Sequence, residues 1–513
     1  MEEIKTIDKE KFRFVNDSER LHDKKLDTKP IGYFRDAFNR FKKNKGSIVA
    51  AIIVMIMILF AIVGPFCFNA QYQKDYAVEK DMMRYQYLLP KISFMEGTGI
   101  WDGSSRKKIN LATKYRYEAM AIETGYAPIQ KIYGEEYGTY DVRINSYASI
   151  DCFQKTLTEA QYRELMAWQD ENQIQVIMPY VNNDLAKMNN MNVWYVCDQK
   201  GMPTFESGSK EFIPAYYTYA SAVGRRDGYT STMRLANDPY LKGDVDNGWS
   251  YAQRTGTAET GYNYVVRVNS YNYFIYRWGF EPCFAFGSNN MGYDIFSRLA
   301  SGARFSMLFA LAVSVINLVI GAIYGAIEGY YGGALDLAME RISDILSAIP
   351  SMVVTVLFNL HLSAKVGVVP SLLYAFILTG WIGMAARTRM QFYRFKNQEY
   401  VMAARTLGAR DRRVIWKHIF PNSLGTLITG SVLVIPSVIF SETSLTYLGI
   451  INLDSPTMSS VGAMLSAGQG MMSQFPHLIF FPALFIGLLM VSFNLFGNGL
   501  RDAFNPSLRG VED

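Results

Sequence analysis

The chain has 513 residues, enough for several soluble domains, and 50% of them are hydrophobic. Its mean hydropathy of +0.02 is high for a wholly soluble protein and low for one confined to the membrane, which indicates membrane spans together with a sizeable polar part. The net charge of only +5 excludes a global nucleic-acid footprint, so no nucleic-acid partner is expected.

The cysteine pattern argues against a zinc site. Cys67, Cys152, Cys197 and Cys283 show neither CxxC nor His-paired spacing. We therefore expect neither a metal nor a cofactor on this chain. Cys152 and Cys197 could pair if their compartment is oxidising, and unpaired buried thiols are an equal alternative.

Residues 1–46 are predicted to form a cytoplasmic tail that ends in an amphipathic helix. Within the last part of this segment, Phe34, Phe38 and Phe41 recur at helical spacing among basic residues. Such a helix lies among lipid headgroups, and the alternative is a basic flank without a helix. In both cases the positive-inside rule places this end in the cytoplasm and in contact with membrane lipids.

Residues 47–67 are predicted to be the first membrane span. This stretch carries no charged residue, and about 20 apolar residues are enough to cross the hydrocarbon core. Because it begins far from Met1 and no small-residue cleavage site follows, we expect it to be retained.

Residues 68–286 are predicted to be an inserted α+β domain on the extracellular side, because they follow a span that starts in the cytoplasm. A helix is expected over 157–172, and strands are expected over 174–181 and 261–278. The side chains proposed for the inner face of the helix are Leu157, Ala160, Leu165 and Trp168.

The tyrosines of this insert could bind carbohydrate or peptide, or could simply fit half-buried strands. Histidine is absent from residues 69–286, which removes most hydrolase triads, and no catalytic residue is expected. Residues 140–147 and 264–271 match at six identical positions plus one Ile/Val exchange. Paired strands, a duplicated subdomain and chance are all compatible with this match.

Residues 287–509 are predicted to hold five further spans, which are spans two to six of the chain. The third span of the chain is expected to bend or begin near Pro350, and the fifth to kink at Pro436. With the first span they place both termini in the cytoplasm. The loop 386–422 is rich in arginine and lysine, which independently favours the cytoplasmic side. The predicted spans are 305–327, 345–362, 366–385, 424–448 and 478–496.

Within this loop the sequence predicts a helix, a turn and a second helix. Ala403, Ala404 and Leu407 favour the first helix, and Gly408 permits a sharp turn. Asp411 can cap a second helix, which we expect over 412–419, and Pro421 marks the end of the loop. The alternative is an ordinary basic loop.

This stretch resembles the EAA loop of binding-protein-dependent ABC import permeases. The residues that match the motif in identity and spacing are Ala403, Ala404, Gly408 and Pro421. The departures from the motif are Met402 for its Glu, His418 at a hydrophobic position and Phe420 for its Leu. Glu399 could supply the carboxylate that Met402 lacks.

In that family the loop forms a coupling helix that docks into a cleft of the ATP-hydrolysing subunit. The resemblance therefore implies an ATPase-coupling surface in this chain. The residues assigned to it are Glu399, Tyr400, Ala403, Ala404, Leu407, Gly408, Asp411, Phe420 and Pro421.

Residues 287–308 resemble the lead-in to the second span of C-type subunits of dipeptide and oligopeptide permeases. Residues 493–509 resemble the closing motif of the same subunits, with Asn498 in place of Asp. The lead-in residues that agree are Gly287, Gly292, Asp294, Ser297, Arg298, Leu299, Gly302, Ala303 and Arg304, and those that depart are Ser288, Asn289 and Tyr293.

Together these resemblances imply an all-α polytopic membrane protein of the type I ABC importer permease fold, with residues 97–284 additional to the usual subunit. They imply half of a peptide translocation path in the cell membrane of a bacterium, and we expect a Gram-positive one. The implied partners are a B-type permease subunit, two ATPase subunits and an extracellular solute-binding protein. Because the chain lacks GxxxxGK[ST], it is not expected to be an enzyme, and ATP and Mg²⁺ belong to the partners.

Other interpretations stay open at this point. The cargo could be nickel, an oligosaccharide or an opine, or the chain could be a membrane-anchored receptor or assembly factor. Glu442, near the end of the fifth span, is either a residue of the translocation path or a carboxylate at a helix end. Small residues in the spans serve either close helix packing or substrate contact: Gly321, Gly325, Gly380, Gly383, Ser431, Ser437 and Ser441.

Overall fold

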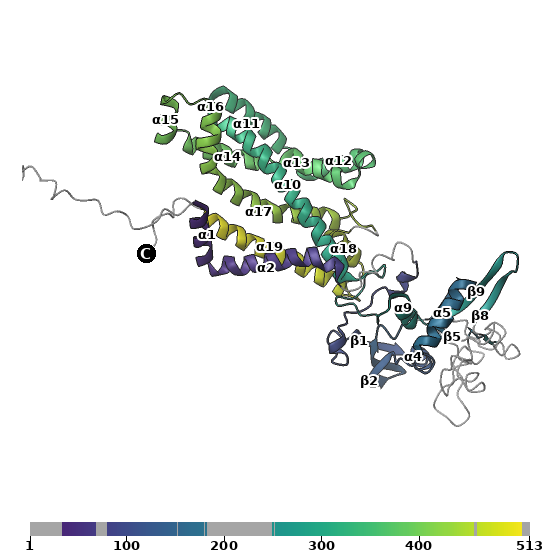
Figure 1. Cartoon of the computed structure of the whole chain (residues 1–513). Coiled ribbons are helices and arrows are strands. Elements are labelled where there is room, and N and C mark those ends of the chain that lie inside the picture. The colour runs from purple at the N-terminus through teal and green to yellow at the C-terminus, as the bar shows by residue number, and fades with distance from the viewer. Residues whose placement is uncertain are drawn as a thin grey trace, which may run out of the picture.

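The structure is a computed structural model that describes residues 33–67, 80–150, 152–178, 180–181, 249–250, 252–455 and 459–504. It consists of an elongated bundle of helices and a smaller α/β part at one end of that bundle (Figure 1). The α/β part is formed by residues between the first long helix and the second, as expected for an insert. Cys197 lies outside the described residues, so the pairing of Cys152 stays a prediction.

The bundle contains five helical segments that are long and apolar enough to cross a membrane, and a sixth if the bent pair α11–α12 counts as one span. Its helices are α1 (Tyr33–Lys43), α2 (Lys45–Val63), α10 (Ile295–Tyr331), α11 (Gly333–Ser347), α12 (Ser351–Val366), α13 (Val368–Gly380), α14 (Ile382–Phe395), α15 (Glu399–Thr406), α16 (Asp411–Arg413), α17 (Phe420–Tyr447), α18 (Val461–Gln469) and α19 (His477–Ala503).

The third predicted span differs from the structure in its extent. The chain bends by 72° between α11 and α12, with Pro350 immediately before α12. Proline lacks the backbone N–H of a helix interior, so it is accepted where a helix begins. The bend near Pro350 is confirmed, but helix already covers Gly333–Ser347.

The lead-in segment fixes the start of α10. The Asp294 carboxylate accepts hydrogen bonds from the backbone N–H of Phe296 at 3.0 Å and from the Ser297 hydroxyl at 3.1 Å. These bonds satisfy donors that the first turn of a helix leaves free. Arg298 then donates to Asp454 at 2.6 Å, which joins the start of α10 to the loop before α18.

Close contacts between α10 and α14 organise the bundle. A side chain at Gly321 would meet Met384 Cβ at 2.7 Å, and one at Gly329 would meet the carbonyl oxygen of Arg389 at 2.8 Å. Gly325 lies between them and faces the backbone of Ala385. The packing role predicted for Gly321 and Gly325 is therefore confirmed. A Cβ added at Gly383 would meet no neighbouring atom within 4 Å, so the packing role predicted for that residue is wrong.

The insert contains two main sheets of order β1-β3-β2 and β4-β9-β5, with β8 also paired to β9, and a short β6-β7 pair. Its strands are β1 (Ser104–Asn110), β2 (Ile129–Glu136), β3 (Thr139–Asn145), β4 (Phe153–Thr158), β5 (Ile177–Met178), β6 (Tyr180–Val181), β7 (Trp249–Ser250), β8 (Ala252–Thr257) and β9 (Gly261–Val268). Its helices are α4 (Leu111–Thr124), α5 (Glu159–Asn172) and α9 (Ser270–Trp278).

The helix predicted over 157–172 is confirmed as α5, which begins at a capping box formed by Thr158 and Gln161. Its predicted inner face is only partly right. Leu165 is buried, but Ala160 is exposed, Trp168 is half-buried, and Leu157 is buried from β4 instead.

The strand predicted over 261–278 is right only for its first half. The Asn269 side chain accepts hydrogen bonds from the backbone N–H groups of Tyr271 and Asn272 and so starts α9. The matching segments 140–147 and 264–271 fall on β3 and β9, which lie in separate sheets. The possibility that they pair with each other is therefore wrong.

We predict that Gly325→Ala destabilises the protein by about 1–3 kcal/mol, because the added methyl group must push α14 away from α10. Gly383→Ala is the matched control and should be neutral or slightly stabilising, since alanine favours helix and has open space there. Thermal unfolding of the detergent-purified variants measures both effects. Equal midpoints for the two variants would contradict the packing described.

Candidate functional site

The loop between α14 and α17 forms a helix and a turn at one end of the bundle (Figure 1). Helix α15 runs over Glu399–Thr406, and the turn follows at Gly408, whose φ is +81°. Only glycine adopts this left-handed backbone without strain. A Cβ here would meet no atom within 4 Å, so backbone conformation rather than space requires glycine.

The second half of the loop differs from the prediction at Asp411. The residue before the helix is Arg410, and no side chain caps α16. The Asp411 carboxylate instead accepts a hydrogen bond from the Tyr330 hydroxyl of α10 at 2.6 Å. Its predicted capping role is wrong because a distant phenol binds the carboxylate.

The second helix of the loop also continues past Pro421. A π turn over Val414–Ile419 continues α16 directly into α17, and the Phe420 N–H donates to the carbonyl of Ile415. A proline ring crowds the carbonyl four residues earlier, and a wider π turn relieves that clash. The second helix predicted over 412–419 therefore does not end at Ile419, and one continuous helix joins the loop to the membrane core.

Buried apolar contacts fasten the loop to the bundle. Val401 of α15 and Val414 and Ile419 of the π turn are fully buried and pack with Ala326 of α10 and Phe392 of α14. Such dense packing leaves little freedom for the loop to move alone. The loop and the ends of α10 and α14 therefore form one rigid unit.

Tyr400 is held beside the start of α17. The Asn422 amide donates a hydrogen bond to the Tyr400 phenol oxygen at 3.2 Å. Partial burial raises the pKa of Tyr400 above its usual value, so the phenol is neutral at physiological pH.

The outer surface of the loop is apolar and basic. Leu407 is 88% exposed and Met402 is 51% exposed, and Trp416 lies exposed nearby in the chain. Exposed apolar surface rimmed by charge is typical of protein-interaction sites. Of the assigned coupling residues, Ala404 and Phe420 are half-buried, and those exposed are Glu399, Tyr400, Ala403, Leu407, Gly408, Asp411 and Pro421.

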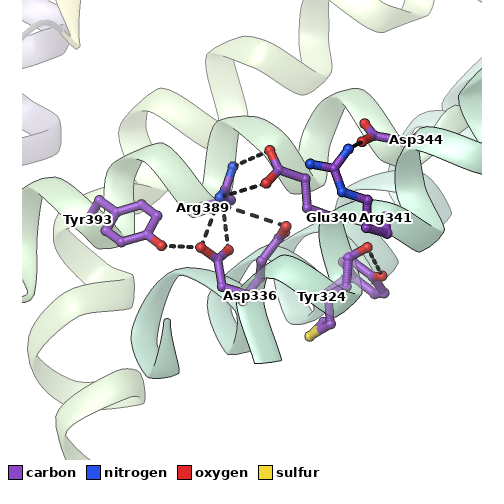
Figure 2. Close-up of polar contacts among 9 residues, drawn as sticks. Tyr324, Asp336, Glu340, Arg341, Asp344, Arg389 and Tyr393 are labelled. Carbon is purple, nitrogen blue, oxygen red and sulfur yellow. Dashed lines mark hydrogen bonds and ion pairs between the residues drawn. The ribbon is translucent and has the colours of Figure 1, made fainter. Parts of the chain in front are cut away.

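A cluster centred on Arg389 supports the base of the loop (Figure 2). Its guanidinium donates to Asp336 at 2.6 and 2.9 Å and to Glu340 at 2.9 and 3.2 Å, and lies 3.5 Å from Glu328. The Tyr393 hydroxyl also donates to Asp336. One arginine of α14 thereby binds carboxylates of α10 and α11, a geometry to which its planar fork is suited.

From the sequence, Arg389 was predicted only to be one of the basic residues of the loop 386–422. The available signal was helical spacing, because Asp336 and Glu340 lie one turn apart, as do Arg389 and Tyr393. Spacing shows that each pair shares a helix face, but not that the two faces meet.

A cavity of about 380 Å³ lies between α12, α13 and α17. Among the described residues that line it none is charged. Hydroxyl groups alternate with apolar side chains such as Phe376 and Phe440. The hydroxyl-bearing residues are Ser351, Thr355, Thr379, Ser437, Ser441 and Ser444. Ser437 and Ser441, left open from the sequence between packing and substrate contact, thus line this cavity.

Glu442 is buried away from this cavity. Its carboxylate accepts hydrogen bonds from Ser306 of α10 at 2.9 Å and from Thr446 at 3.2 Å, and the side chain has no exposed surface. This geometry ties α10 to α17 and does not support the prediction that Glu442 lines a path. The described residues contain no cluster of metal-binding side chains.

These features define a multi-span membrane protein with an exposed basic loop at one end and a β-containing insert at the other. Residues 317–510 match the family described as binding-protein-dependent transport system inner membrane component, and residues 32–90 match the N-terminal TM domain of oligopeptide transport permease C. The residues between these two matches include the whole described insert beyond Pro90.

Curated relatives agree with this assignment. The oligopeptide transport system permease protein OppC of Bacillus subtilis is 42% identical over 224 residues, 44% of this chain and 72% of the relative. The dipeptide transport system permease protein DppC of the same organism is 38% identical over 44% of this chain and 69% of its own length. OppC of Haemophilus influenzae is 40% identical over 44% of this chain and 70% of its own length.

The chain therefore belongs to the family of binding-protein-dependent transport system inner membrane components. This confirms the resemblance seen in the sequence and the predicted class of polytopic helical membrane protein. The relatives are permeases rather than enzymes. A solved inward-facing structure of the MetNI methionine ABC transporter is 14% identical over 40% of this chain and 96% of its own, with a TM-score of 0.34, which is too low to support a conclusion.

We predict that Arg389→Met destabilises the protein by about 1–3 kcal/mol, because Asp336, Glu340 and Glu328 then repel one another without a shared cation. Arg341→Met is the control, since Arg341 makes a single exposed ion pair with Asp344 at 2.9 Å on the same helix as Asp336. That variant should change stability by less than about 0.5 kcal/mol. Chemical or thermal unfolding in detergent would reveal the contrast, and equal losses would show that Arg389 has no special role.

Proposed function

We propose that this chain is the C-type permease subunit of an ABC importer for short peptides. The observation that carries the proposal is the continuous helix from Asp411 to Tyr447, which connects the exposed loop to the cavity between α12, α13 and α17. Family membership and the named peptide permeases among the relatives support it.

The chemistry of the cavity favours peptides over nickel. Nickel is typically bound by imidazole, thiolate or carboxylate groups, and the described residues of the lining include no histidine, cysteine, aspartate or glutamate. Hydroxyl groups can exchange hydrogen bonds with peptide groups, while Phe376 and Phe440 offer apolar contact to varied side chains. This lining forms one subunit's half of the path, and a B-type permease subunit supplies the other half.

The exposed loop is the docking surface for one of two ATPase subunits, which bind the ATP and Mg²⁺. Closure of the ATPase pair moves the loop, and the movement reaches the cavity because α16, the π turn and α17 form one helix. The buried contacts of Val401, Val414 and Ile419 and the Arg389 cluster keep the loop from moving alone. A membrane receptor or assembly factor would have no need of this lever.

We propose that the loop and both termini lie in the cytoplasm and the insert outside, an orientation that the basic residues of the loop favour. A solute-binding protein delivers the peptide on the outer side. Residues 97–284 extend the outer surface beyond that of the usual subunit, and we assign them a role in docking this binding protein.

We predict that Leu407→Asp lowers ATP-driven peptide uptake by at least about tenfold, because a carboxylate replaces an apolar contact at the centre of the docking surface. Stability should change by less than about 0.5 kcal/mol, since Leu407 is 88% exposed. Uptake of a radiolabelled tripeptide into proteoliposomes and copurification of the ATPase subunits measure the two consequences.

Tyr137→Asp provides the matched control, because Tyr137 is 99% exposed on the insert. This variant should copurify with its ATPase subunits as well as the unchanged chain does, because Tyr137 lies outside the loop. Normal uptake by Leu407→Asp would argue that the loop does not couple to an ATPase.

We further predict that Ser441→Phe obstructs the cavity and lowers uptake severalfold or more, while ATPase copurification and its basal hydrolysis stay normal. Ile56→Phe in α2 places the same ring on an exposed membrane-facing surface and should have little effect. Proteoliposome uptake with these two variants tests the assignment of the path. Unimpaired transport through Ser441→Phe would place the path elsewhere.

A further inference from the structure

The insert contains the same arrangement of elements twice. In the first module β1 leads into α4, and the hairpin β2–β3 follows. In the second module β4 leads into α5, and the hairpin β8–β9 follows after a long intervening segment. In both modules the last strand pairs antiparallel with the first strand and with its hairpin partner, and both helices have 14 residues.

Strand register makes the two modules equivalent residue by residue. Ser105 pairs with Ile144 in the first module, as Phe153 pairs with Val268 in the second. The helix caps Asn110 and Thr158 likewise pair with Thr139 and Asn263.

The ends of the last strands agree as well. The Asn145 side chain accepts a hydrogen bond from the Tyr147 N–H at 2.9 Å, and the Asn269 side chain accepts one from the Tyr271 N–H at 2.8 Å. Segments 140–147 and 264–271, which are similar in sequence, thus occupy the same place in two modules. The duplicated subdomain considered from the sequence accounts for the match.

One corner of the module is filled in the second copy and open in the first. In the second copy Phe153 packs edge-on against Tyr273 with ring centroids 5.5 Å apart, and the Lys155 amine lies 4.8 Å from the Tyr273 ring. The equivalent residues in the first copy follow from the register: Ser105 for Phe153, Ser149 for Tyr273 and Lys107 for Lys155. Two aromatic rings are replaced by two serines.

The space so left is a cavity of about 590 Å³, within the range of about 300–1,000 Å³ common for small-molecule sites. Ser105, Lys107 and Ser149 all line it. Its far wall is Phe475, from the segment before α19, on which Tyr87 stacks with centroids 4.6 Å apart. The cavity therefore lies where the insert meets the membrane bundle.

The charge of the cavity is one-sided. Arg84 and Lys107 contribute two cations, and the described lining residues include no aspartate or glutamate. Lys155 lies over the ring of Tyr273, and Lys107 has no equivalent ring beside it because Ser149 takes that place. The Lys107 amine lies 5.6 Å from the ring of Phe475 instead. Apolar surface from Leu88, Ile144 and Ile150 completes the walls.

We infer that this cavity binds the C-terminal end of a short peptide, with Arg84 and Lys107 facing the terminal carboxylate. Cations paired with a carboxylate ligand form strong hydrogen bonds, Ser105, Ser149 and Gln86 can bond peptide groups, and the apolar walls accept side chains. This inference rests on the proposed peptide cargo. A peptide bound here touches both the insert and the segment leading into α19.

The test is equilibrium binding of trialanine to the full-length chain purified in its complex, compared with trialanine amide, which lacks the terminal charge. The free acid should bind at least about tenfold more tightly than the amide. Lys107→Glu should weaken binding of the acid by at least about tenfold. Lys108→Glu should not, because successive residues of a strand face opposite sides and Lys108 lies opposite Asp141 in the register.

Ser105→Phe tests whether a loss of binding comes from a filled cavity rather than from misfolding. It introduces phenylalanine, the residue that the second module has at the equivalent position, so the fold should tolerate it. It should abolish trialanine binding while leaving the thermal midpoint of the protein unchanged or higher. Equal binding of acid and amide, or unchanged binding by Lys107→Glu and Ser105→Phe, would overturn the inference. The inference would also be overturned if Lys107→Glu weakened only the binding of the solute-binding protein and left trialanine binding unchanged.

Uptake measured in parallel separates this inference from the proposed function. Normal tripeptide uptake without detectable trialanine binding at the cavity would refute the site and leave the importer intact. Binding that depends on Lys107 in a complex unable to transport any peptide would refute the importer instead.

Discussion

The contact between the end of α10, α14 and the loop that follows is the interaction on which the rest of the molecule depends. Arg389 joins two helices through Asp336, Glu340 and Glu328, and immediately beside it glycines bring α10 and α14 together. Charges hold the helices in register only where backbones approach closely, and close approach buries the charges enough for their geometry to matter.

In the function proposed above, this contact lets the exposed loop act as a lever. Docking surfaces can be mobile, but a lever must transmit displacement, and here the helix from Asp411 to Tyr447 has no break. Pro421 would ordinarily interrupt such a helix. The π turn before it preserves continuity, which agrees with the frequent occurrence of these turns at functional positions.

The two modules of the insert differ at one corner, which side chains fill in the second copy and a cavity occupies in the first. The second copy completes its core with Phe153 and Tyr273. The first copy has serines at both positions, and Phe475 of the bundle forms the opposite wall of the space. The first module instead makes contacts with the membrane part, such as the stacking of Tyr87 on Phe475. The same contacts link the insert to the helices.

The sequence by itself determined features that depend on neighbouring residues. Apolar length placed the membrane helices, and Gly408 marked a sharp turn, because hydrophobicity and backbone freedom act within a few residues. Only the tertiary structure decided that Asp411 binds Tyr330 and that Glu442 is buried against Ser306. It likewise decided that residues 105 and 149 border a cavity. These outcomes depend on groups that lie far apart along the chain, and local pattern carries no information about which distant surface a side chain will meet.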